Sequence, residues 1–234
     1  LYDINIVDGV SMKFRAGEIV GISGLLGAGR TELMQAVTGA YQMKGKGTVK
    51  LNGKTVRFDS PAAAIKAGIG YVTEDRKTTG LILRQSIRFN ISMASLSRII
   101  KNGVLYPGKE RAVVNGLKED LRIKTENVEN PVSSLSGGNQ QKVVLAKWLA
   151  INPSILILDE PTRGVDVGAR YEIYTIIKEL AAKGNTIIMI SSDLPEVIGM
   201  SDRVYVMYEG KVRGELSKKE LSEDAIMRYA TGIA

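Results

Sequence analysis

The sequence predicts an α/β fold in which helices surround a mostly parallel β-sheet. Short apolar runs of strand length alternate with segments of helical spacing up to about residue 80 and again after about residue 150, an order of elements that builds parallel sheets. Between residues 81 and 149 the strand pattern fades and helical spacing dominates. We therefore expect a sheet core formed by residues 1–80 and 150–234, and a helical subdomain at 81–149.

The first part of the chain contains the clearest turn signals. Asn52-Gly53 lies in the middle of an alternating segment, and this dipeptide suits the positive φ angles of a tight hairpin turn. Gly39 and Gly68 each follow a segment of helical spacing and are expected to end a helix. The predicted elements are a strand at 18–23, a helix at 31–38, a hairpin at 48–56, a helix at 62–67 and a strand at 69–73.

The rest of the chain first loses and then regains the α/β alternation. In the middle, Asn102-Gly103 and Pro107-Gly108 are expected to break helices, and a helix is expected from Gln140 to about Ala150. Trp148 is assigned to the core. The last part is predicted to hold a strand at 155–158, a helix at 169–183, a strand at 186–190, a hairpin at 204–216 and a packing helix at 220–229.

Composition limits the chemistry that the chain can use. The 234 residues include no cysteine and no histidine, which excludes disulfides, thiolate or histidine zinc sites and any histidine general base. An enzyme built from this chain must use carboxylates, Lys and Arg, hydroxyl groups and backbone amides. With 32 basic and 25 acidic residues the net charge is +7, which suits an anionic ligand, a membrane surface or a nucleic acid and selects none of them.

The start of the chain and its hydropathy give two further expectations. The sequence begins with Leu1-Tyr2-Asp3 rather than Met, so we expect an excised fragment or a processed form. It contains no apolar run of about 18 residues and no visible signal peptide, so it is expected neither to span a membrane nor to be secreted.

A glycine cluster follows the first predicted strand. From residue 24 it is Gly-Leu-Leu-Gly-Ala-Gly-Arg-Thr, which matches the phosphate-loop pattern G-x-x-x-x-G-K-[ST] except that Arg30 stands at the lysine position. The backbone N–H groups of such a loop and the helix N-terminus favour phosphate, and the Thr31 hydroxyl would bind Mg²⁺. The alternative is a glycine-rich turn without a ligand. The nucleotide-binding candidates are Gly24, Gly27, Ala28, Gly29, Arg30, Thr31 and Glu32.

Two carboxylates end the predicted strand at 155–158. Asp159 and Glu160 stand where nucleotide hydrolases place a Mg²⁺ ligand and a residue that orients or deprotonates the attacking water. A strand that merely ends in polar residues is the alternative. The phosphate loop and this carboxylate pair, each on the expected element, together favour nucleotide binding.

A second glycine pair lies just before the helix predicted from Gln140. From residue 135 the chain is Leu-Ser-Gly-Gly-Asn-Gln-Gln, so backbone amides are expected to lie open at the helix N-terminus as a second anion site. The alternative is a helix cap in which Ser136 accepts from backbone N–H groups, although a cap alone needs no Gly-Gly. The binding candidates here are Ser136, Gly137, Gly138 and Gln140.

These segments, in this order, resemble the ATP-binding domains of ABC transporters over nearly the whole chain. Residues 135–141 are similar to the signature motif, 159–162 to the Walker B motif and 164–166 to the D-loop. The resemblance implies a P-loop NTPase with a RecA-like core, an N-terminal antiparallel β part and an inserted helical subdomain. It implies ATP and Mg²⁺ as cofactors and adds Asp166 to the nucleotide-binding candidates. It also implies two such domains packed head to tail, with each ATP between one P-loop and the other signature.

A narrower resemblance is to the second, C-terminal ATPase half of bacterial monosaccharide importers of the ribose, xylose and galactose type. It rests on residues 27–33, 74–77, 135–141 and 160–168. The implied partners are the N-terminal ATPase half of the same polypeptide, transmembrane permease subunits and, indirectly, a periplasmic or extracellular sugar-binding protein, with no nucleic acid. The implied location is the cytoplasmic face of the bacterial membrane, with the helical insert and the region after Glu74 facing the permease. Tyr2 is a candidate to lie near the adenine.

Three departures from the family pattern fall on one nucleotide site. Arg30 replaces the P-loop lysine, and a planar guanidinium need not reach the β- and γ-phosphates in the same way. Glu74 stands at the position of the Q-loop glutamine, where its carboxylate repels phosphate but can bind a cation. Ser192 stands at the position of the switch histidine and cannot carry positive charge. The catalytic candidates are Glu160, Ser192 and Glu74, and the metal candidates are Thr31, Asp159 and Glu74.

These departures predict two unequal sites. The site on this domain's own P-loop is expected to bind ATP and Mg²⁺ and to hydrolyse ATP weakly, whereas the intact signature is expected to complete the partner half's site. Two other functions remain open. One is a non-hydrolysing regulatory dimerisation module. The other is a soluble ABC ATPase acting on nucleic acid or ribosomes, but against it the sequence contains no long coiled-coil insert and no Lys/Arg-rich arm. Co-purification of the chain with a membrane permease, rather than with nucleic acid, would distinguish an importer ATPase from a soluble ABC ATPase.

Overall fold

A six-stranded sheet forms the core of the computed structural model, which describes residues 7–41 and 47–233. The strand order is β10-β9-β1-β8-β7-β4, and every neighbouring pair is parallel except β9 and β10. The predicted parallel sheet is therefore confirmed. The strands are β1 (Ile19–Gly24), β4 (Ile69–Val72), β7 (Ile155–Asp159), β8 (Thr186–Ile190), β9 (Arg203–Tyr208) and β10 (Lys211–Ser217).

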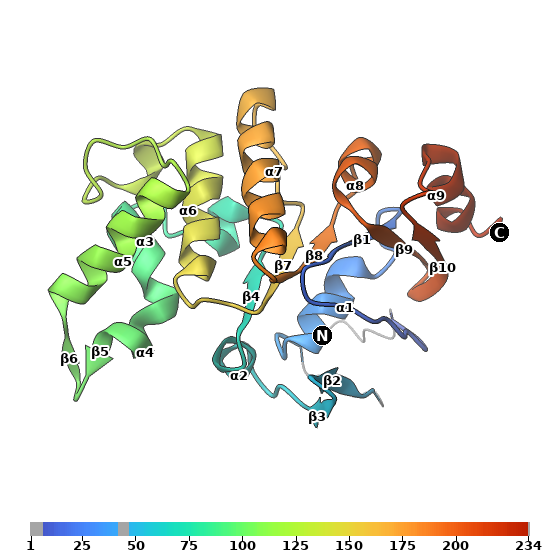
Figure 1. Ribbon diagram of the computed structural model, residues 1–234, viewed down its shortest axis with the longest axis horizontal. Helices are drawn as coiled ribbons and strands as arrows, with labels where there is room; N and C mark the ends of the chain where they lie inside the picture. Colours follow the sequence, from blue (N-terminus) through green and yellow to red (C-terminus); the bar gives the residue numbers. More distant parts are fainter. Residues whose placement is uncertain (1–6, 42–46, 234) are drawn as a thin grey trace.

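Helices cover both faces of this sheet, as Figure 1 shows. One face carries α1 (Arg30–Val37) and α2 (Pro61–Lys66), and the other carries α7 (Val167–Ala182), α8 (Leu194–Met200) and α9 (Glu223–Ala230). Side chains alternate along each strand, so Leu156 packs in the cluster that includes α7 while Ile157 packs in the cluster that includes α1. Burial on both sides explains why the central strands β7 and β8 are nearly continuous apolar runs.

Two short hairpins lie outside the main sheet. The hairpin of β2 (Val49–Leu51) and β3 (Lys54–Val56) is antiparallel, as predicted. A second hairpin, β5 (Ile100–Lys101) and β6 (Val104–Leu105), was expected only as a helix break. Asn102 has a φ of 53° and Gly103 a φ of 78°, which are the positive values that a two-residue hairpin turn requires.

A helical lobe separates β4 from β7 in the chain and lies at one end of the molecule (Figure 1). It holds α3 (Ile87–Ser92), α4 (Leu96–Ile99), α5 (Pro107–Asp120) and α6 (Gly137–Leu149), together with a π-turn η1 (Arg76–Gly80) and the 3₁₀ turns η2 (Met93–Ser95) and η3 (Val132–Ser134). The helical insert was predicted, but its last helix begins earlier than Gln140. Ser136 is the N-cap residue and its hydroxyl accepts from the Asn139 backbone N–H, so both glycines belong to the first turn.

Helix α6 carries two buried lysines, one of which contacts the core helix α7 and one of which contacts η1. Lys142 donates to the Arg122 carbonyl at 3.0 Å and pairs with Glu172 of α7 at 2.5 Å. Lys147 donates to the Gly80 carbonyl at 2.6 Å and has no carboxylate partner among the described ion pairs. Burial lowers the pKa of Lys147 to about 8, because an uncompensated charge is disfavoured in the interior.

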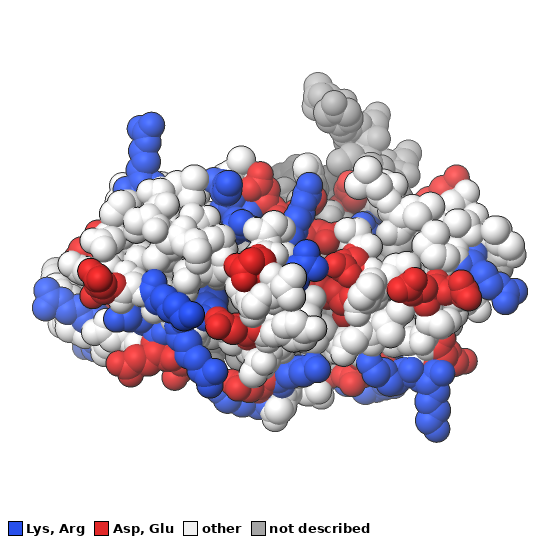
Figure 2. All heavy atoms as spheres, turned by 90° about the horizontal axis from the view of Figure 1, so that it is seen from above, with Lys and Arg blue, Asp and Glu red and all other residues white. Residues whose placement is uncertain are grey.

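The surface mixes charges of both signs. Figure 2 shows Lys and Arg side chains lying beside Asp and Glu side chains across the face that is uppermost in Figure 1. Within the described residues, no helix is both long and apolar enough to cross a bilayer.

The depressed pKa of Lys147 predicts a pH-dependent stability. Because the ordinary pKa is 10.5 and the folded value is about 8, the unfolded chain binds more protons between these values, and stability rises with pH across that window. Relative to Lys147→Met, the wild-type free energy of unfolding should increase by about 2 kcal/mol from about pH 7 to about pH 9.5. Urea unfolding at both pH values measures this. Relative to the exposed-site variant Lys178→Met, the wild type should show no such increase, and an equal increase relative to both variants would contradict the assignment.

Candidate functional site

The glycine loop between β1 and α1 opens onto a cavity of about 330 Å³. Gly24 has no room for a side chain, because a Cβ there would lie 2.3 Å from the Met207 carbonyl oxygen. Gly29 caps α1 with a φ of 91°, which turns the helix N-terminus toward the cavity. The lining residues come from the loop and from the ends of three strands: Leu26, Gly27, Ala28, Gly29, Arg30, Thr31, Glu32, Glu74, Glu160, Arg163 and Ser192.

The guanidinium of Arg30 is bound by groups of the protein. The residue is only 8% exposed, Nη1 donates to the Ser191 carbonyl at 2.8 Å, and Nη2 lies 3.8 Å from Glu160 Oε1. The positive charge at the P-loop lysine position is therefore directed at the ends of β7 and β8.

Glu160 is held in a strained backbone conformation at the end of β7. Its φ is 49°, a left-handed value that costs a residue with a side chain about 1–3 kcal/mol and that is found preferentially at functional sites. Its N–H donates to the Ile190 carbonyl at 2.9 Å, and its Oε1 accepts from the Ser192 N–H at 2.8 Å. Burial raises the pKa of Glu160, and Ser192 and Arg30 partly oppose that rise.

Asp159 lies behind the cavity and is 1% exposed. Oδ2 accepts from the Tyr71 hydroxyl at 3.0 Å, whereas Oδ1 is buried with no hydrogen-bond partner. Burial raises the pKa of Asp159 to about 6, opposed first by the Thr31 hydroxyl. An unpartnered carboxylate oxygen beside a hydroxyl fits a Mg²⁺ ion, which is commonly held by one or two protein groups together with phosphate oxygens. The described residues contain no cluster of three acidic, His or Cys side chains that could hold a metal ion.

The Ser136–Gly138 turn lines a different hollow, of about 220 Å³. A Cβ at Gly138 would lie 2.4 Å from the Cβ of Ala169, so the absence of a side chain lets α6 approach α7. Asp166 caps α7 by accepting from the Ala169 N–H at 2.9 Å. The lining residues are Lys124, Ser136, Gly138, Asn139, Lys142, Asp166, Gly168, Ala169 and Glu172. None of them lines the P-loop cavity.

The candidate residues therefore separate into two groups. Nine line the P-loop cavity, namely Gly27, Ala28, Gly29, Arg30, Thr31, Glu32, Glu74, Glu160 and Ser192, whereas Asp159 and Gly24 are not among its lining residues. Ser136, Gly138 and Asp166 line the other hollow. The Gln140 side chain is buried and donates to the Leu135 carbonyl at 3.1 Å, so it supports this turn from within. Tyr2 lies outside the described residues.

Sequence reasoning missed two side chains that organise these sites. Tyr71 binds Asp159 from the neighbouring strand β4, and only the pairing of β4 with β7 reveals it. Arg76 donates to two carbonyls of the segment that follows Glu160. The only sequence signal for the segment 74–77 is its resemblance to a family.

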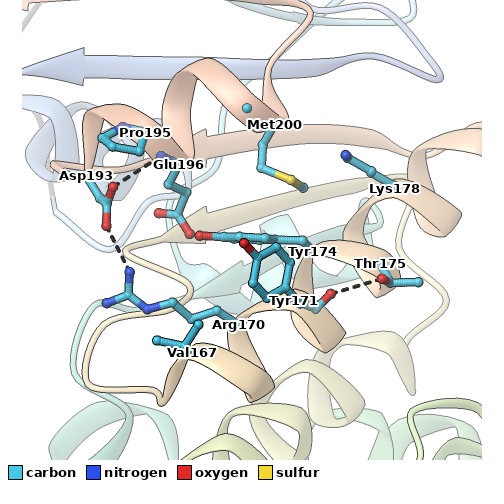
Figure 3. A pocket seen from close by; sticks show the side chains of 11 residues that line it. Val167, Arg170, Tyr171, Tyr174, Thr175, Lys178, Asp193, Pro195, Glu196 and Met200 are labelled. Carbon is cyan, nitrogen blue, oxygen red and sulfur yellow. Dashed lines mark hydrogen bonds and ion pairs between the residues drawn. The ribbon is translucent and has the colours of Figure 1, made fainter.

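A larger hollow of about 580 Å³ lies between α7 and α8 and contains none of the predicted site residues (Figure 3). One wall carries the Arg170–Asp193 ion pair, at 3.0 Å. Glu196 in the same hollow accepts from the Thr162 hydroxyl at 2.7 Å. These contacts tie α8 to α7 and to the segment after Glu160, so we assign this hollow a structural role.

Comparison with known proteins agrees with this geometry. Residues 7–163 match the family described as ABC transporter, and the chain belongs to that family. It is 54% identical over 223 residues to the ribose import ATP-binding protein RbsA of Lactococcus lactis subsp. cremoris, covering 95% of this chain and 45% of that protein. It is 51% identical to the xylose import ATP-binding protein XylG of Geobacillus kaustophilus, covering 97% of this chain and 45% of that protein.

A solved structure supports the same fold. The dimeric ATP-binding cassette MJ0796, in a post-hydrolysis state with ADP and Pi, superimposes with a TM-score of 0.77 at 21% identity, covering 91% of this chain and 90% of that chain. The fold is that of an ABC ATP-binding cassette, a P-loop NTPase, as the sequence predicted. The chain spans less than half the length of the two sugar-import relatives.

The contact of Gly138 with α7 predicts a stability effect. Gly138→Ala should lower the free energy of unfolding by about 1–3 kcal/mol, because the added methyl group forces two packed helices apart. Gly116→Ala in α5, where an added Cβ would meet nothing within 4 Å, is the matched control and should stabilise by about 0.5–1 kcal/mol. Urea unfolding of both variants measures the difference. Equal stability of the two would contradict the close approach.

Proposed function

We propose that this chain is one ATP-binding half of a carbohydrate ABC importer, which couples ATP hydrolysis to the uptake of a monosaccharide. The identity to ribose and xylose import ATP-binding proteins supports this substrate class. Their greater length supports a polypeptide with two such halves, of which this is the second. The narrower sequence resemblance, over residues 74–77 and 160–168 among others, supports the same assignment.

The separation of the two hollows is the observation that carries the proposal. The P-loop cavity and the signature hollow have no lining residue in common, which supports a model in which the signature acts on the nucleotide of another half rather than on that of its own P-loop. A head-to-tail arrangement with a second half brings each signature to the other P-loop. The related cassette MJ0796 is itself dimeric with ADP and Pi bound.

In the chain's own site, the residues present can hold ATP and Mg²⁺. The P-loop amides and the N-terminus of α1 would bind the phosphates, and Asp159 and Thr31 would hold the ion, which when bound neutralises phosphate charge. Glu160 would orient the attacking water or accept its proton.

The same site is expected to hydrolyse ATP weakly. Arg30 is bound to the Ser191 carbonyl and lies near Glu160, so its charge is directed at the carboxylate that should act on water. Glu74 forms an ion pair with Arg163 in the lining of the cavity, which engages both groups and puts a carboxylate, which repels phosphate, in the wall of the nucleotide site. Ser192 contributes only neutral groups. The signature, by contrast, is complete and would serve the partner half's P-loop.

The proposed partners follow from this role. They are the other ATPase half of the same polypeptide, a membrane permease facing the helical lobe and the region after Glu74, and a sugar-binding protein that acts through the permease. The proposed location is the cytoplasmic face of the membrane.

The asymmetry between the two sites predicts a ranking of variants in the full two-half protein. Ser136→Ala or Gly137→Val should lower ATPase activity by about a hundredfold or more, because the first removes the signature hydroxyl and the second adds a side chain that crowds the turn. Arg30→Ala should cost less than about fivefold, because it affects the weak site. Steady-state phosphate release measures all three variants.

Thermal unfolding of the same variants is the control for loss of fold. The asymmetry is refuted if Arg30→Ala is the more damaging change while all three variants remain folded.

The separate 234-residue chain should bind ATP in a Mg²⁺-dependent manner and turn it over slowly. ATP with Mg²⁺ should raise its melting temperature by several degrees, and Asp159→Asn should remove most of the Mg²⁺-dependent part of that rise, because binding to the native state alone stabilises it. Differential scanning fluorimetry with ATP, with and without EDTA, measures this. Hydrolysis as fast as that of the full protein would contradict a weak site.

A further inference from the structure

The π-turn η1 connects the region after β4 to both the signature helix and the D-loop. Its first residue, Arg76, donates from Nη1 to the Arg163 carbonyl at 2.6 Å and from Nη2 to the Gly164 carbonyl at 2.9 Å. Both carbonyls belong to the short segment between Glu160 and Asp166. One planar guanidinium therefore fixes two consecutive peptide groups, which a lysine could not do in the same way.

The same guanidinium lies against the signature. A Cβ at Gly137 would be 3.0 Å from Arg76 Nη2 and 3.3 Å from the Gly164 carbonyl oxygen. Gly137 is thus the point at which the signature turn, Arg76 and the D-loop segment meet, and a side chain there would crowd Arg76 and the Gly164 carbonyl.

The turn itself is held rigidly. Asp75 caps η1 by accepting from the backbone N–H groups of Lys77 at 2.8 Å and Thr78 at 3.2 Å, and these hydrogen bonds lower the pKa of Asp75. At the other end, the Gly80 carbonyl accepts from Lys147 of α6 at 2.6 Å. The helix that begins at the signature therefore also holds the turn that carries Arg76.

One further contact and one unpartnered atom bear on the role of Arg76. Glu74, two residues earlier, forms an ion pair with the Arg163 side chain, so the same short segment is held at its backbone and at its side chain. The Nε of Arg76 is buried without a partner, a cost that a solvated surface arginine would avoid.

We propose that Arg76 is a positioning residue, which holds the D-loop segment 163–166 in a fixed position relative to the signature turn Ser136–Gly138, so that both contact the partner half's nucleotide together. This inference rests on the proposed function. Because η1 lies in the region after Glu74 that is assigned to the permease interface, a displacement of that region would move Arg76 and change the position of the D-loop segment relative to the signature turn.

The test uses the full two-half protein with Arg76→Gln, Arg76→Lys and the matched control Lys77→Gln, which changes an exposed side chain of the same turn. Hydrogen exchange of a peptide covering 160–168 should be at least about threefold faster in Arg76→Gln than in wild type or Lys77→Gln, with sheet peptides unchanged. The kcat for ATP should fall by at least about tenfold, with KM changed by less than about threefold, because the substitution leaves both P-loops of the two-half protein unchanged. Arg76→Lys should be intermediate in both measurements.

Each outcome decides the inference. Unchanged exchange at 160–168, or faster exchange with unchanged kcat, would overturn it. If Arg76→Gln fails to fold, the Arg76→Lys variant gives the same comparison. Absence of ATPase activity in the wild type would refute the proposed function instead, while the exchange data would still show whether Arg76 holds the segment.

Discussion

The crossing of α6 and α7 is the contact on which the arrangement of the functional segments depends. At this crossing, Gly138 lies against Ala169, and the buried Lys142 pairs with Glu172. The N-terminus of α6 is the signature turn, and the N-terminus of α7 is capped by Asp166 of the D-loop. Because a glycine permits the close approach and an ion pair fixes it, two segments from different parts of the chain form one surface.

Much of the fold could be predicted from local sequence patterns, because each helix and each strand shows its own characteristic spacing of apolar residues. The apolar runs at 155–158 and 186–190 became buried parallel strands, and Asn52-Gly53 became a hairpin turn. The start of α6 was misplaced because the two glycines suggested a loop, whereas Ser136 caps the helix ahead of them. From sequence alone, a glycine pair that contacts phosphate cannot be distinguished from one that allows close helix packing. At position 138, helix packing by itself already requires glycine.

The candidate site was predicted less completely, since several of its contacts link distant positions. Tyr71 and Asp159 are 88 positions apart, Arg76 and Arg163 are 87 apart, and Lys147 and Gly80 are 67 apart. No periodicity or spacing rule joins such pairs. The sequence shows that an arginine, Arg30, replaces the P-loop lysine. It does not show that the guanidinium of Arg30 points toward Ser191 and Glu160.

The separateness of the P-loop cavity and the signature hollow has a consequence for how such a domain evolves. Under the proposed two-half function, a substitution of a residue that lines one hollow removes no lining side chain from the other, so one copy can change its own chemistry and still be retained for what it supplies to its neighbour. Arg30, Glu74 and Ser192 all lie in one hollow, and the intact signature lies in the other. Division of labour between paired copies thus requires no new fold, only two surfaces that share no side chain.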